Sequence, residues 1–391
     1  MKPKVIPYGR QEIIQADIDA VINVLQSDFL TQGPIVPKFE TEITEYCGAK
    51  HAVAVNSATS ALHIACLALG VGPGDIVWTS AITFVASSNC ALYCGAKIDF
   101  VDINPLTYNL STMALEEKLF EAEKVGNLPK VVIPVHLCGQ SCNMEDIYAL
   151  SQKYGFKIIE DASHAIGGKY QGKPVGSCKY SDITVFSFHP VKIITTAEGG
   201  VASTNDALLD KKLRLFRSHG VSGDKDAMEE RPREEIWNYQ QIDLGFNYRM
   251  TELQAALGSS QIKRIDEFVA KRNIIARRYN QLLDDLPLQL PRQHPESYSS
   301  VHLYVIRIKH GETRKTQRQV YDGLNEGNIR ANLHYIPVYL HPYYEKLGFS
   351  RGYCPNAELY YSEAISIPVF PGLKVDDQDR VVDILTTLIG M

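Results

Sequence analysis

The sequence predicts a protein of the α/β class. Through the first two thirds of the chain, short apolar runs rich in β-branched residues alternate with amphipathic stretches, and this alternation is typical of strands joined by crossover helices. The chain of 391 residues also exceeds the size at which one hydrophobic core stops growing. At roughly 150 residues per domain, this length favours two or three domains.

The expected elements follow in chain order. An amphipathic helix over 17–27 and a second helix over 38–47 precede a buried apolar strand over 52–55. The next helix, over 59–69, ends at Gly70, a residue type that closes helices readily. Further strands are expected over 76–78, 98–101, 130–135, 157–161, 183–187 and 201–203, with helical segments over 81–94 and 146–154.

Residues 222–237 interrupt this pattern because Asp, Lys, Glu, Arg and Pro dominate them. Such a composition predicts an exposed insert, for which a mobile lid over a functional site is one interpretation. Beyond it we expect one or two long helices over 251–279, a strand over 302–309, and helices over 316–325 and 381–389. The chain is thus predicted to form a large α/β domain over 17–255 and a smaller α+β domain over 256–391, preceded by an N-terminal segment over 1–16.

Composition and charge argue against several classes of partner. A net charge of −5 does not suit a general nucleic-acid binder, which needs a basic surface. Apolar stretches such as 61–71 are shorter than the roughly 20 residues that cross a bilayer, and residues 1–5 precede no apolar signal core. We expect a cytoplasmic protein that binds neither nucleic acid nor membrane.

The cysteines are expected to be core thiols. Eight cysteines in a chain of this length do not indicate a disulfide framework. The pairs Cys90/Cys94 and Cys138/Cys142 are spaced as C-x3-C, whereas zinc knuckles usually have two or four intervening residues. We therefore predict no metal site.

Lys192 is the first candidate for chemistry. It follows the predicted strand 183–187, and its apolar neighbours Val191, Ile193 and Ile194 disfavour a charged ammonium. A lysine with a lowered pKa is a nucleophilic amine. Taken alone, Lys192 could equally be a surface lysine whose stem lies on apolar side chains.

Two further features support a role for Lys192. Asp161 ends a predicted strand, where open α/β sheets place ligand-binding groups. A carboxylate there can keep a pyridine nitrogen protonated, so that the ring accepts electrons, although a helix cap is the plain alternative. Residues 56–60 join a strand to a helix, so Ser57, Ala58 and Thr59 can face a phosphate or form an ordinary N-cap.

Three weaker candidates accompany these residues. Ser187 could add a phosphate contact, Phe84 could stack on an aromatic ring, and His164 could lie against that ring or its phenolic oxygen. A turn serine, a core phenylalanine and a structural histidine are the respective alternatives. Together the features fit one cofactor that carries a phosphate and a pyridine ring, whereas no G-x-G-x-x-G or Walker A motif is present.

These segments resemble a known family. Their order and spacing are similar to those of the DegT/DnrJ/EryC1/StrS aminotransferases over nearly the whole chain, in the segments 29–34, 56–62, 72–75, 160–165, 187–192, 198–200, 217–220 and 244–250. The resemblance implies a PLP-dependent transferase of fold type I, like aspartate aminotransferase, with a large, mostly parallel sheet domain and a smaller C-terminal α+β domain. It also implies pyridoxal 5′-phosphate, glutamate as amino donor, and a homodimer with shared active sites.

The resemblance also implies a role for each matching residue. Lys192 would form the Schiff base with the cofactor, Asp161 would contact its pyridine nitrogen, and Asn247 would reach the phosphate from the partner subunit. The implied catalytic set is Lys192, Asp161 and His164, and the implied cofactor site adds Ser57, Ala58, Thr59, Phe84, Ser187 and Asn247.

Within the family, segments 161–164, 187–192 and 334–339 look most like the transaminases of pseudaminic acid biosynthesis. Those enzymes aminate C4 of a UDP-linked 4-keto-6-deoxy-N-acetylhexosamine. For this sugar nucleotide, the likeness points to a substrate site that includes the N-terminal segment. Its implied residues are Tyr8, Asp28, Phe29, Leu30, Thr31, Asn332, Leu333, His334 and Tyr335.

The sequence departs from the family pattern at two positions, and several alternative functions stay open. Many relatives have Gly at the position of Ala58 and Pro at the position of Ile193, but neither difference removes a reacting group. Related sugar dehydratases carry His in place of Lys192, and His189 lies three positions too early for that role. The alternatives are amination at C3, a dTDP- or GDP-linked sugar, and a catalytically silent PLP-binding regulator. A nucleotide-sugar epimerase or dehydrogenase would need a Gly-rich turn that is missing.

Overall fold

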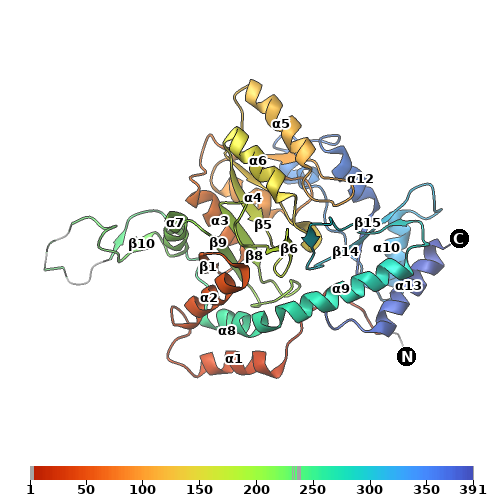
Figure 1. The fold of residues 1–391 in the computed structure, drawn as a ribbon, viewed down its shortest axis with the longest axis horizontal. Helices are drawn as coiled ribbons and strands as arrows, with labels where there is room; N and C mark the ends of the chain where they lie inside the picture. The colour runs from red at the N-terminus through yellow and green to blue at the C-terminus, as the bar shows by residue number, and fades with distance from the viewer. Residues whose placement is uncertain (1–3, 231, 233, 236–238, 391) are drawn as a thin grey trace.

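A seven-stranded sheet forms the centre of the computed structural model, which describes residues 4–230, 232, 234–235 and 239–390 (Figure 1). The strand order is β1-β9-β8-β5-β4-β2-β3. β9 runs antiparallel to both neighbours, and the other neighbouring strands are parallel. The bounds are β1 (His51–Val55), β2 (Ile76–Ser80), β3 (Lys97–Val101), β4 (Val131–Ile133), β5 (Lys157–Asp161), β8 (Ile183–Ser187) and β9 (Gly200–Thr204).

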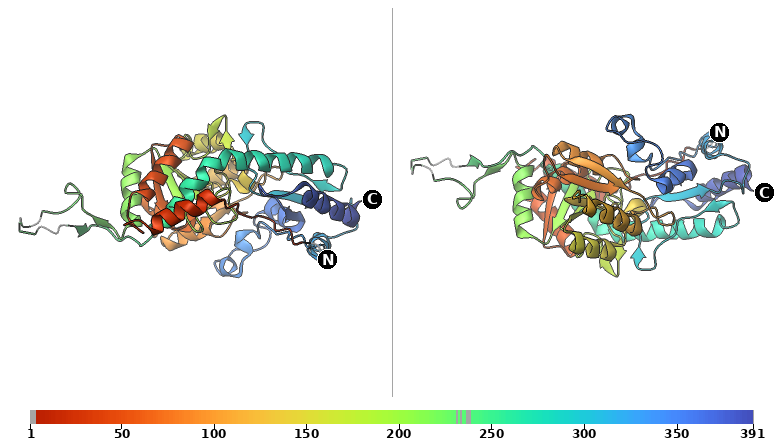
Figure 2. Two further views of the ribbon diagram at one scale, coloured as in Figure 1. Left: turned by 90° about the horizontal axis from the view of Figure 1, so that it is seen from below. Right: turned by 90° about the horizontal axis from the view of Figure 1, so that it is seen from above.

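Helices cover both faces of this sheet (Figures 1 and 2). Val53 and Val55 of β1 pack into one core, whereas Ala52 and Ala54 pack into another, because successive side chains of a strand point to opposite faces. Burial on both faces accounts for the continuous apolar runs in the sequence. α3 (Ala58–Ala68), α4 (Ala86–Tyr93) and α7 (Ala207–Arg217) cover one face; α2 (Ile35–Cys47), α5 (Thr112–Lys124), α6 (Met144–Tyr154) and α8 (Glu252–Gln261) cover the other.

A second, antiparallel sheet in the order β12-β14-β15 lies toward the C-terminus. α9 (Ile265–Leu282) contributes to two cores, since Phe268 and Val269 pack beside the large sheet while Ile275 and Tyr279 pack beside the small one. The elements of this part are β12 (Leu288–Gln289), β14 (Tyr304–Ile308), β15 (Ala364–Ile367), α10 (Gln317–Glu326), α11 (Pro342–Glu345), α12 (Pro355–Glu363) and α13 (Val375–Ile389). Outside both sheets are α1 (Gln15–Leu25) and the short strands β6 (Lys169–Tyr170), β7 (Lys173–Pro174) and β13 (Ser297–Tyr298).

The α/β class is confirmed, but the starts of two predicted helices differ from the structure by several residues. The helix expected over 381–389 is α13, which begins earlier, at Val375. The helix expected over 81–94 begins only at Ala86. The preceding residues instead leave β2, and the backbone of Ala81 pairs with Val101 and Val338. Of the one or two helices expected over 251–279, the structure has two, α8 and α9, which are separated by the 3-10 turn Ile262–Arg264.

Four helices, α5, α7, α11 and α12, were not predicted, although α5 and α7 carry start signals. Asp206 is the N-cap of α7, and its side chain accepts hydrogen bonds from the backbone N–H groups of Leu208 and Leu209. Ser111 caps α5 in the same way. Capping residues followed by apolar spacing are the sequence signal that was available for both helices.

The described residues of the segment predicted to be an exposed insert belong to a hairpin that projects from the body of the molecule (Figures 1 and 2). Its base is the antiparallel pair β10 (Val221–Ser222) and β11 (Gln240–Gln241). Residues 231, 233 and 236–238, on which part of the lid interpretation falls, lie outside the described residues. The described residues of the hairpin do not line the cavity presented below.

Across the described ranges, every helix is too short or too polar to traverse a bilayer.

All eight cysteines are free thiols, and all but Cys138 are buried. The prediction that most of the cysteines are buried is therefore confirmed.

The buried carboxylate of Glu40 joins α2 to α7 and β1. It accepts hydrogen bonds from Arg214 at 2.8 Å, from Arg217 at 2.7 Å and from the backbone N–H of Ala54 at 2.8 Å. Glu40→Ala would leave the mostly buried Arg217 without its carboxylate, so we expect the free energy of unfolding to fall by about 3–5 kcal/mol. Urea unfolding checks this result.

Glu121→Ala is the control for that measurement. Among the residues that the structure describes, Glu121 pairs only with Lys124, at the surface, and an exposed pair is worth about 1 kcal/mol or less. Equal losses of stability in the two variants would contradict the role assigned to Glu40.

Candidate active site

A cavity of about 900 Å³ lies at the carboxyl ends of β5 and β8, beside the start of α3. β1, β5 and β8 run in the same direction, so the residues that follow them meet at one edge of the sheet. The volume is in the range of small-molecule sites. The predicted residues that line it are Tyr8, Ser57, Ala58, Thr59, Phe84, Asp161, His164, Ser187, Lys192, Asn332, Leu333, His334 and Tyr335.

Five predicted residues do not line this cavity. Asp28 and Phe29 line another cavity of about 570 Å³ between α1, α2 and α8, and Leu30 and Thr31 line neither. Asn247 is exposed, and its backbone oxygen accepts a 3.4 Å hydrogen bond from a side chain of the β1–α3 turn. A single chain therefore does not bring these five residues to the cavity.

Lys192 lies in the loop after β8, where its backbone N–H donates to the carbonyl of His189 at 2.9 Å. The next two residues, Ile193 and Ile194, are buried in the core beneath the sheet and hold this loop in place. Burial lowers the pKa of the Lys192 amine to about 8, and the charge of Asp161 opposes this shift. A nucleophilic neutral amine is therefore available close to neutral pH.

This lowered pKa predicts how the reactivity of Lys192 depends on pH in the apoprotein. Only the neutral amine reacts, so its rate of modification by trinitrobenzenesulfonate should reach half of its maximum near pH 8, the pKa of about 8 given by burial. In Asp161→Asn, the negative charge that raises this pKa is lost, and the midpoint should move to lower pH. Peptide mapping by mass spectrometry measures both titrations, with Lys130 as the reference. A midpoint near the ordinary value of 10.5 would contradict the prediction.

The N-terminus of α3 presents backbone amides at the cavity. Ser57 is the N-cap, and its hydroxyl oxygen accepts a hydrogen bond from the N–H of Ser60 at 3.1 Å. Helix geometry leaves the N–H groups of Ala58 and Thr59 without intrahelical partners. Such amides, at the positive end of the helix dipole, are suited to a phosphate.

Gly200 of β9 allows the strand to pass close to these amides. A Cβ atom at Gly200 would lie 2.5 Å from the backbone nitrogen of Ala58 and 2.7 Å from its Cα. Any side chain at Gly200 would therefore displace the first residue of α3. The amides can occupy this position only because residue 200 is glycine.

Asp161 ends β5 and is 5% exposed where it lines the cavity. Its carboxylate accepts hydrogen bonds from the hydroxyl groups of Ser87 and Ser163, each at 2.5 Å. A fixed carboxylate at this depth can pair with a cationic ring nitrogen.

Three histidines and Tyr335 form another wall of the cavity. His164 Nε2 lies 3.2 Å from the Tyr335 hydroxyl, and the ring centroids of His164 and His302 are 4.3 Å apart. Burial is the main reason why the pKa of His334 falls to about 3. Burial is also the main reason why the pKa values of His164 and His302 lie well below the ordinary value. All three imidazoles are therefore neutral near pH 7, and they offer hydrogen bonds without positive charge. No group of three or more Cys, His, Asp or Glu side chains in the described part of the chain is arranged to hold a metal ion.

The residues at this site that no sequence motif distinguishes include Thr83, Ser87, Ser163 and His302. Thr83 and Ser163 directly precede the predicted residues Phe84 and His164, but no motif distinguishes them. Ser87 reaches Asp161 from α4, and His302 arrives from the segment before β14. Only the folded chain brings these residues together.

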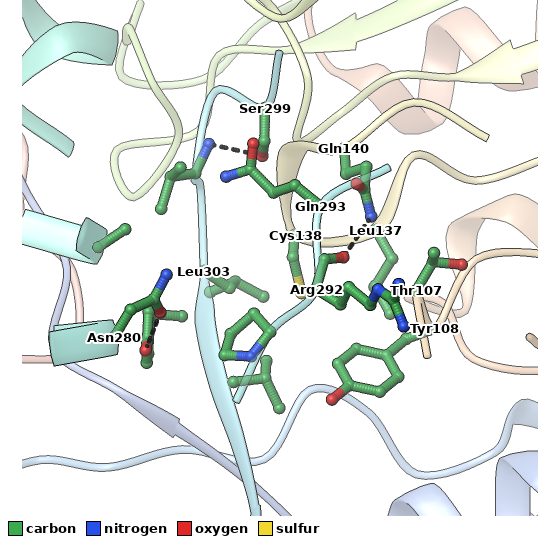
Figure 3. A pocket seen from close by; sticks show the side chains of 15 residues that line it. Thr107, Tyr108, Leu137, Cys138, Gln140, Asn280, Arg292, Gln293, Ser299 and Leu303 are labelled. Atoms are coloured by element: carbon green, nitrogen blue, oxygen red, sulfur yellow. Dashed lines mark hydrogen bonds between the residues drawn. The ribbon is translucent and has the colours of Figure 1, made fainter. Parts of the chain in front are cut away.

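A much smaller cavity of about 40 Å³ lies between loop 136–140 and the start of β14 (Figure 3). Cys138 and Leu303 are among its lining residues. The carbonyl of Cys138 also accepts a 2.8 Å hydrogen bond from the N–H of His302, so this small cavity adjoins the wall of the large one. It has room for about one or two water molecules, and we assign substrates to the larger cavity.

The residues at the larger cavity fit pyridoxal 5′-phosphate. Free amides of α3 suit its phosphate, Asp161 suits its pyridine nitrogen, and the amine of Lys192 suits its aldehyde. Phe84 lines the same cavity with an exposed ring that could cover the cofactor. Together with the mixed, mostly parallel sheet, these features define the class of PLP-dependent transferases of fold type I.

The chain belongs to the DegT/DnrJ/EryC1/StrS aminotransferase family, whose model matches residues 11–386. Aminotransferases of this family depend on pyridoxal phosphate. The protein is therefore a sugar aminotransferase, and the resemblance found in the sequence is confirmed at the level of the family.

Relatives match over nearly the full length of both chains. The spore coat polysaccharide biosynthesis protein SpsC of Bacillus subtilis (strain 168) is 38% identical over 387 residues, which are 98% of this chain and 97% of that protein. The UDP-4-amino-4,6-dideoxy-N-acetyl-beta-L-altrosamine transaminase of Campylobacter jejuni subsp. jejuni serotype O:23/36 (strain 81-176) is 37% identical over 388 residues, 98% of this chain and 97% of that protein. The solved structure of Helicobacter pylori PseC, an aminotransferase involved in the biosynthesis of pseudoaminic acid, has a TM-score of 0.88 at 32% identity and covers 98% of this chain and 99% of that chain.

Proposed function

We propose that this sugar aminotransferase transfers the amino group of glutamate to C4 of a UDP-linked 4-keto-6-deoxy-N-acetylhexosamine. This is the activity expected of a UDP-4-amino-4,6-dideoxy-N-acetyl-β-L-altrosamine transaminase. The observation that carries the chemistry is the arrangement of Lys192, Asp161 and the start of α3 around one cavity. The choice of sugar is supported by the Campylobacter relative, 37% identical over 388 residues, and by the similarity to PseC.

The chain's own residues would hold the cofactor at both ends. The amides of Ala58 and Thr59 would bind the phosphate, together with Ser57 and Ser187. Asp161 would bind the pyridine nitrogen, with His164 near the ring. Pyridoxal phosphate, when bound, supplies an aldehyde that condenses with amines and a ring that accepts electrons.

Lys192 would act twice in a ping-pong reaction. Its amine would hold the aldehyde of the cofactor between turnovers, and as a free amine it would remove the proton from the α-carbon of glutamate. 2-Oxoglutarate leaves before the keto-sugar binds. Lys192 then delivers a proton to C4 of the sugar, and a pKa of about 8 suits both directions of transfer.

The wall that contains Tyr8, Asn332, Leu333, His334 and Tyr335 would bind the sugar. His334 Nδ1 lies 2.8 Å from the hydroxyl of Ser366, so its ring is held in a fixed orientation. A neutral imidazole and phenol groups can exchange hydrogen bonds with sugar hydroxyl and acetamido groups. These groups suit an uncharged hexosamine ring.

The exposed apolar stripe of α1 supports a homodimer. Asp17 anchors the other side of α1 through Ser260, Gln261 and Arg264. In such a dimer, Asn247 and segment 28–31 would come from the partner subunit. The stripe consists of Ile14, Ile18, Ile22 and Leu25, each 39–57% exposed.

A charge in this stripe is expected to separate the subunits. Ile18→Glu would bury a carboxylate at the proposed interface, and the sedimentation coefficient should fall to that of a monomer. Val125→Glu is the matched control, because Val125 is an exposed apolar residue at the end of α5. A monomeric wild-type protein would contradict the proposal.

A substrate panel tests the proposed activity. The purified protein is incubated with glutamate and with UDP-, dTDP- and GDP-linked 4-keto and 3-keto sugars. 2-Oxoglutarate and the aminosugar product are both measured. We expect the highest kcat/KM with the UDP-linked 4-keto-6-deoxy-N-acetylhexosamine; a higher value with a 3-keto, dTDP- or GDP-linked sugar would contradict the assignment. Glutamate oxidation without any aminosugar product would contradict it as well.

A further inference from the structure

Two hydroxyl groups contact the carboxylate of Asp161, and a third lies behind one of them in a connected network. The hydroxyl of Ser87 lies 2.5 Å from Asp161 Oδ2, and the hydroxyl of Ser163 lies 2.5 Å from Oδ1. The backbone N–H of Ser163 also donates to Oδ1 at 3.1 Å. Behind Ser87, the hydroxyl of Thr83 lies 2.7 Å from the hydroxyl of Ser87.

The direction of these hydrogen bonds follows from the number of protons. An ionised carboxylate can only accept, so the single hydroxyl proton of Ser87 is donated to Asp161. Ser87 then has no proton left for Thr83, and Thr83 must donate to Ser87. The chain Thr83 to Ser87 to Asp161 therefore has one polarity, with its negative end at the carboxylate.

The network also leaves one acceptor position of Asp161 free. An ionised carboxylate offers about four lone-pair positions. Among the described residues, Ser163 occupies both positions of Oδ1, and Ser87 occupies one of Oδ2. The remaining position is on Oδ2, and Asp161 lines the cavity.

We propose that Ser87 and Ser163, with Thr83 behind Ser87, are positioning residues that fix the Asp161 carboxylate so that its one free lone pair meets the pyridine nitrogen of the cofactor. This inference rests on the proposed function in one respect, the pairing of Asp161 with that nitrogen. Ser87 and Thr83 are 0% and 2% exposed, so water does not compete for their hydroxyl groups. Without the two serines, the carboxylate could turn and share its charge between both oxygens and incoming water.

The test measures the protonation of the pyridine nitrogen and not activity alone. Apoprotein is loaded with pyridoxal phosphate that carries ¹⁵N in its ring, and the ¹⁵N chemical shift of the bound cofactor is recorded for wild type, Ser87→Ala, Ser163→Ala and the double variant. The glutamate half reaction gives kcat and KM for the same proteins. Ser88→Ala is the matched control, because Ser88 is the next residue of α4, is equally buried, and bonds to Tyr344 instead of Asp161.

The expected result is a graded one. Each single variant should lower kcat by about tenfold with the KM for glutamate nearly unchanged, and the double variant by about 100-fold, because hydrogen bonds to charged groups are individually strong. The ¹⁵N signal of the double variant should move toward that of unprotonated pyridine. Ser87→Thr should restore both readouts. If Ser87→Ala does not fold, Ser163→Ala, in a partly exposed loop, carries the test.

Two failures can be distinguished. If Asp161→Asn shifts the ¹⁵N signal but the double serine variant behaves like Ser88→Ala, the network is overturned while the role of Asp161 stands. If Asp161→Asn leaves the ¹⁵N signal unchanged, the pairing of Asp161 with the pyridine nitrogen is wrong, and this part of the proposed function fails with it.

Discussion

Lys192→Ala is expected to lower kcat by at least about 10³-fold, because the variant lacks both the amine that holds the cofactor and the group that moves the proton. Single-turnover release of 2-oxoglutarate from glutamate measures the loss. Borohydride reduction of the wild-type holoenzyme, followed by peptide mapping, should place the cofactor on Lys192. A small amine such as methylamine should partly restore turnover in the variant, since it can supply the missing base.

Lys130→Ala is the control for this experiment. Lys130 lies just before β4, at the opposite edge of the sheet, where its ammonium bonds to the carbonyl of Gly70 and to Asp75. Its loss should leave kcat close to that of the wild type. Turnover of Lys192→Ala within tenfold of this control, or a reduced adduct on another lysine, would contradict the assignment of Lys192.

Asp161→Ala is expected to retain part of the cofactor and to lose nearly all turnover, with kcat lowered by about 10²–10³-fold. The phosphate end of the site does not depend on Asp161, so binding should survive in part. Without the carboxylate, the pyridine nitrogen is no longer held in its protonated form, and the ring accepts electrons less readily. Cofactor absorbance and the glutamate half reaction measure these two effects separately.

Two further variants serve as comparisons for Asp161→Ala. Asp161→Asn keeps the size of the side chain but removes its charge, so it should lose turnover nearly as fully as Asp161→Ala. Asp182→Ala removes a carboxylate that bonds to Lys157 and to the backbone of Ile158, away from the cavity, and its turnover should stay close to that of the wild type. Near-normal turnover in Asp161→Ala would overturn the role given to this residue.

The large sheet and the centre of the site could be predicted because both depend on local sequence. Apolar runs at 52–55, 157–161 and 183–187 became β1, β5 and β8. Because β1, β5 and β8 run in one direction, the polar residues that follow them gather at one edge of the sheet. Position along the chain was thus sufficient to bring Ser57, Asp161 and Lys192 to one cavity.

The rest of the site depends on contacts that no local pattern contains. His302 follows Lys192 at a great distance in the sequence, and only the packing of loop 136–140 against the start of β14 brings it to the cavity. In the sequence Ser87 looks like any helical serine, and only the fold brings its hydroxyl group to Asp161 at the end of β5. Segment 28–31 overlaps a family motif, but in one chain its first two residues, Asp28 and Phe29, border a different cavity. The role of this segment therefore depends on whether a partner is present.

Helix α9 has a mechanical consequence. Phe268 and Val269 pack beside the large sheet, and Ile275 and Tyr279 pack beside the small one, so one rigid rod is clamped at both ends. Because α9 packs in both cores, we do not expect the part around the large sheet and the part around the small sheet to rotate or unfold independently. The movement that admits and releases a sugar nucleotide is therefore expected to come from loops at the rim of the cavity. The two sheets and α9 should move together as one rigid unit.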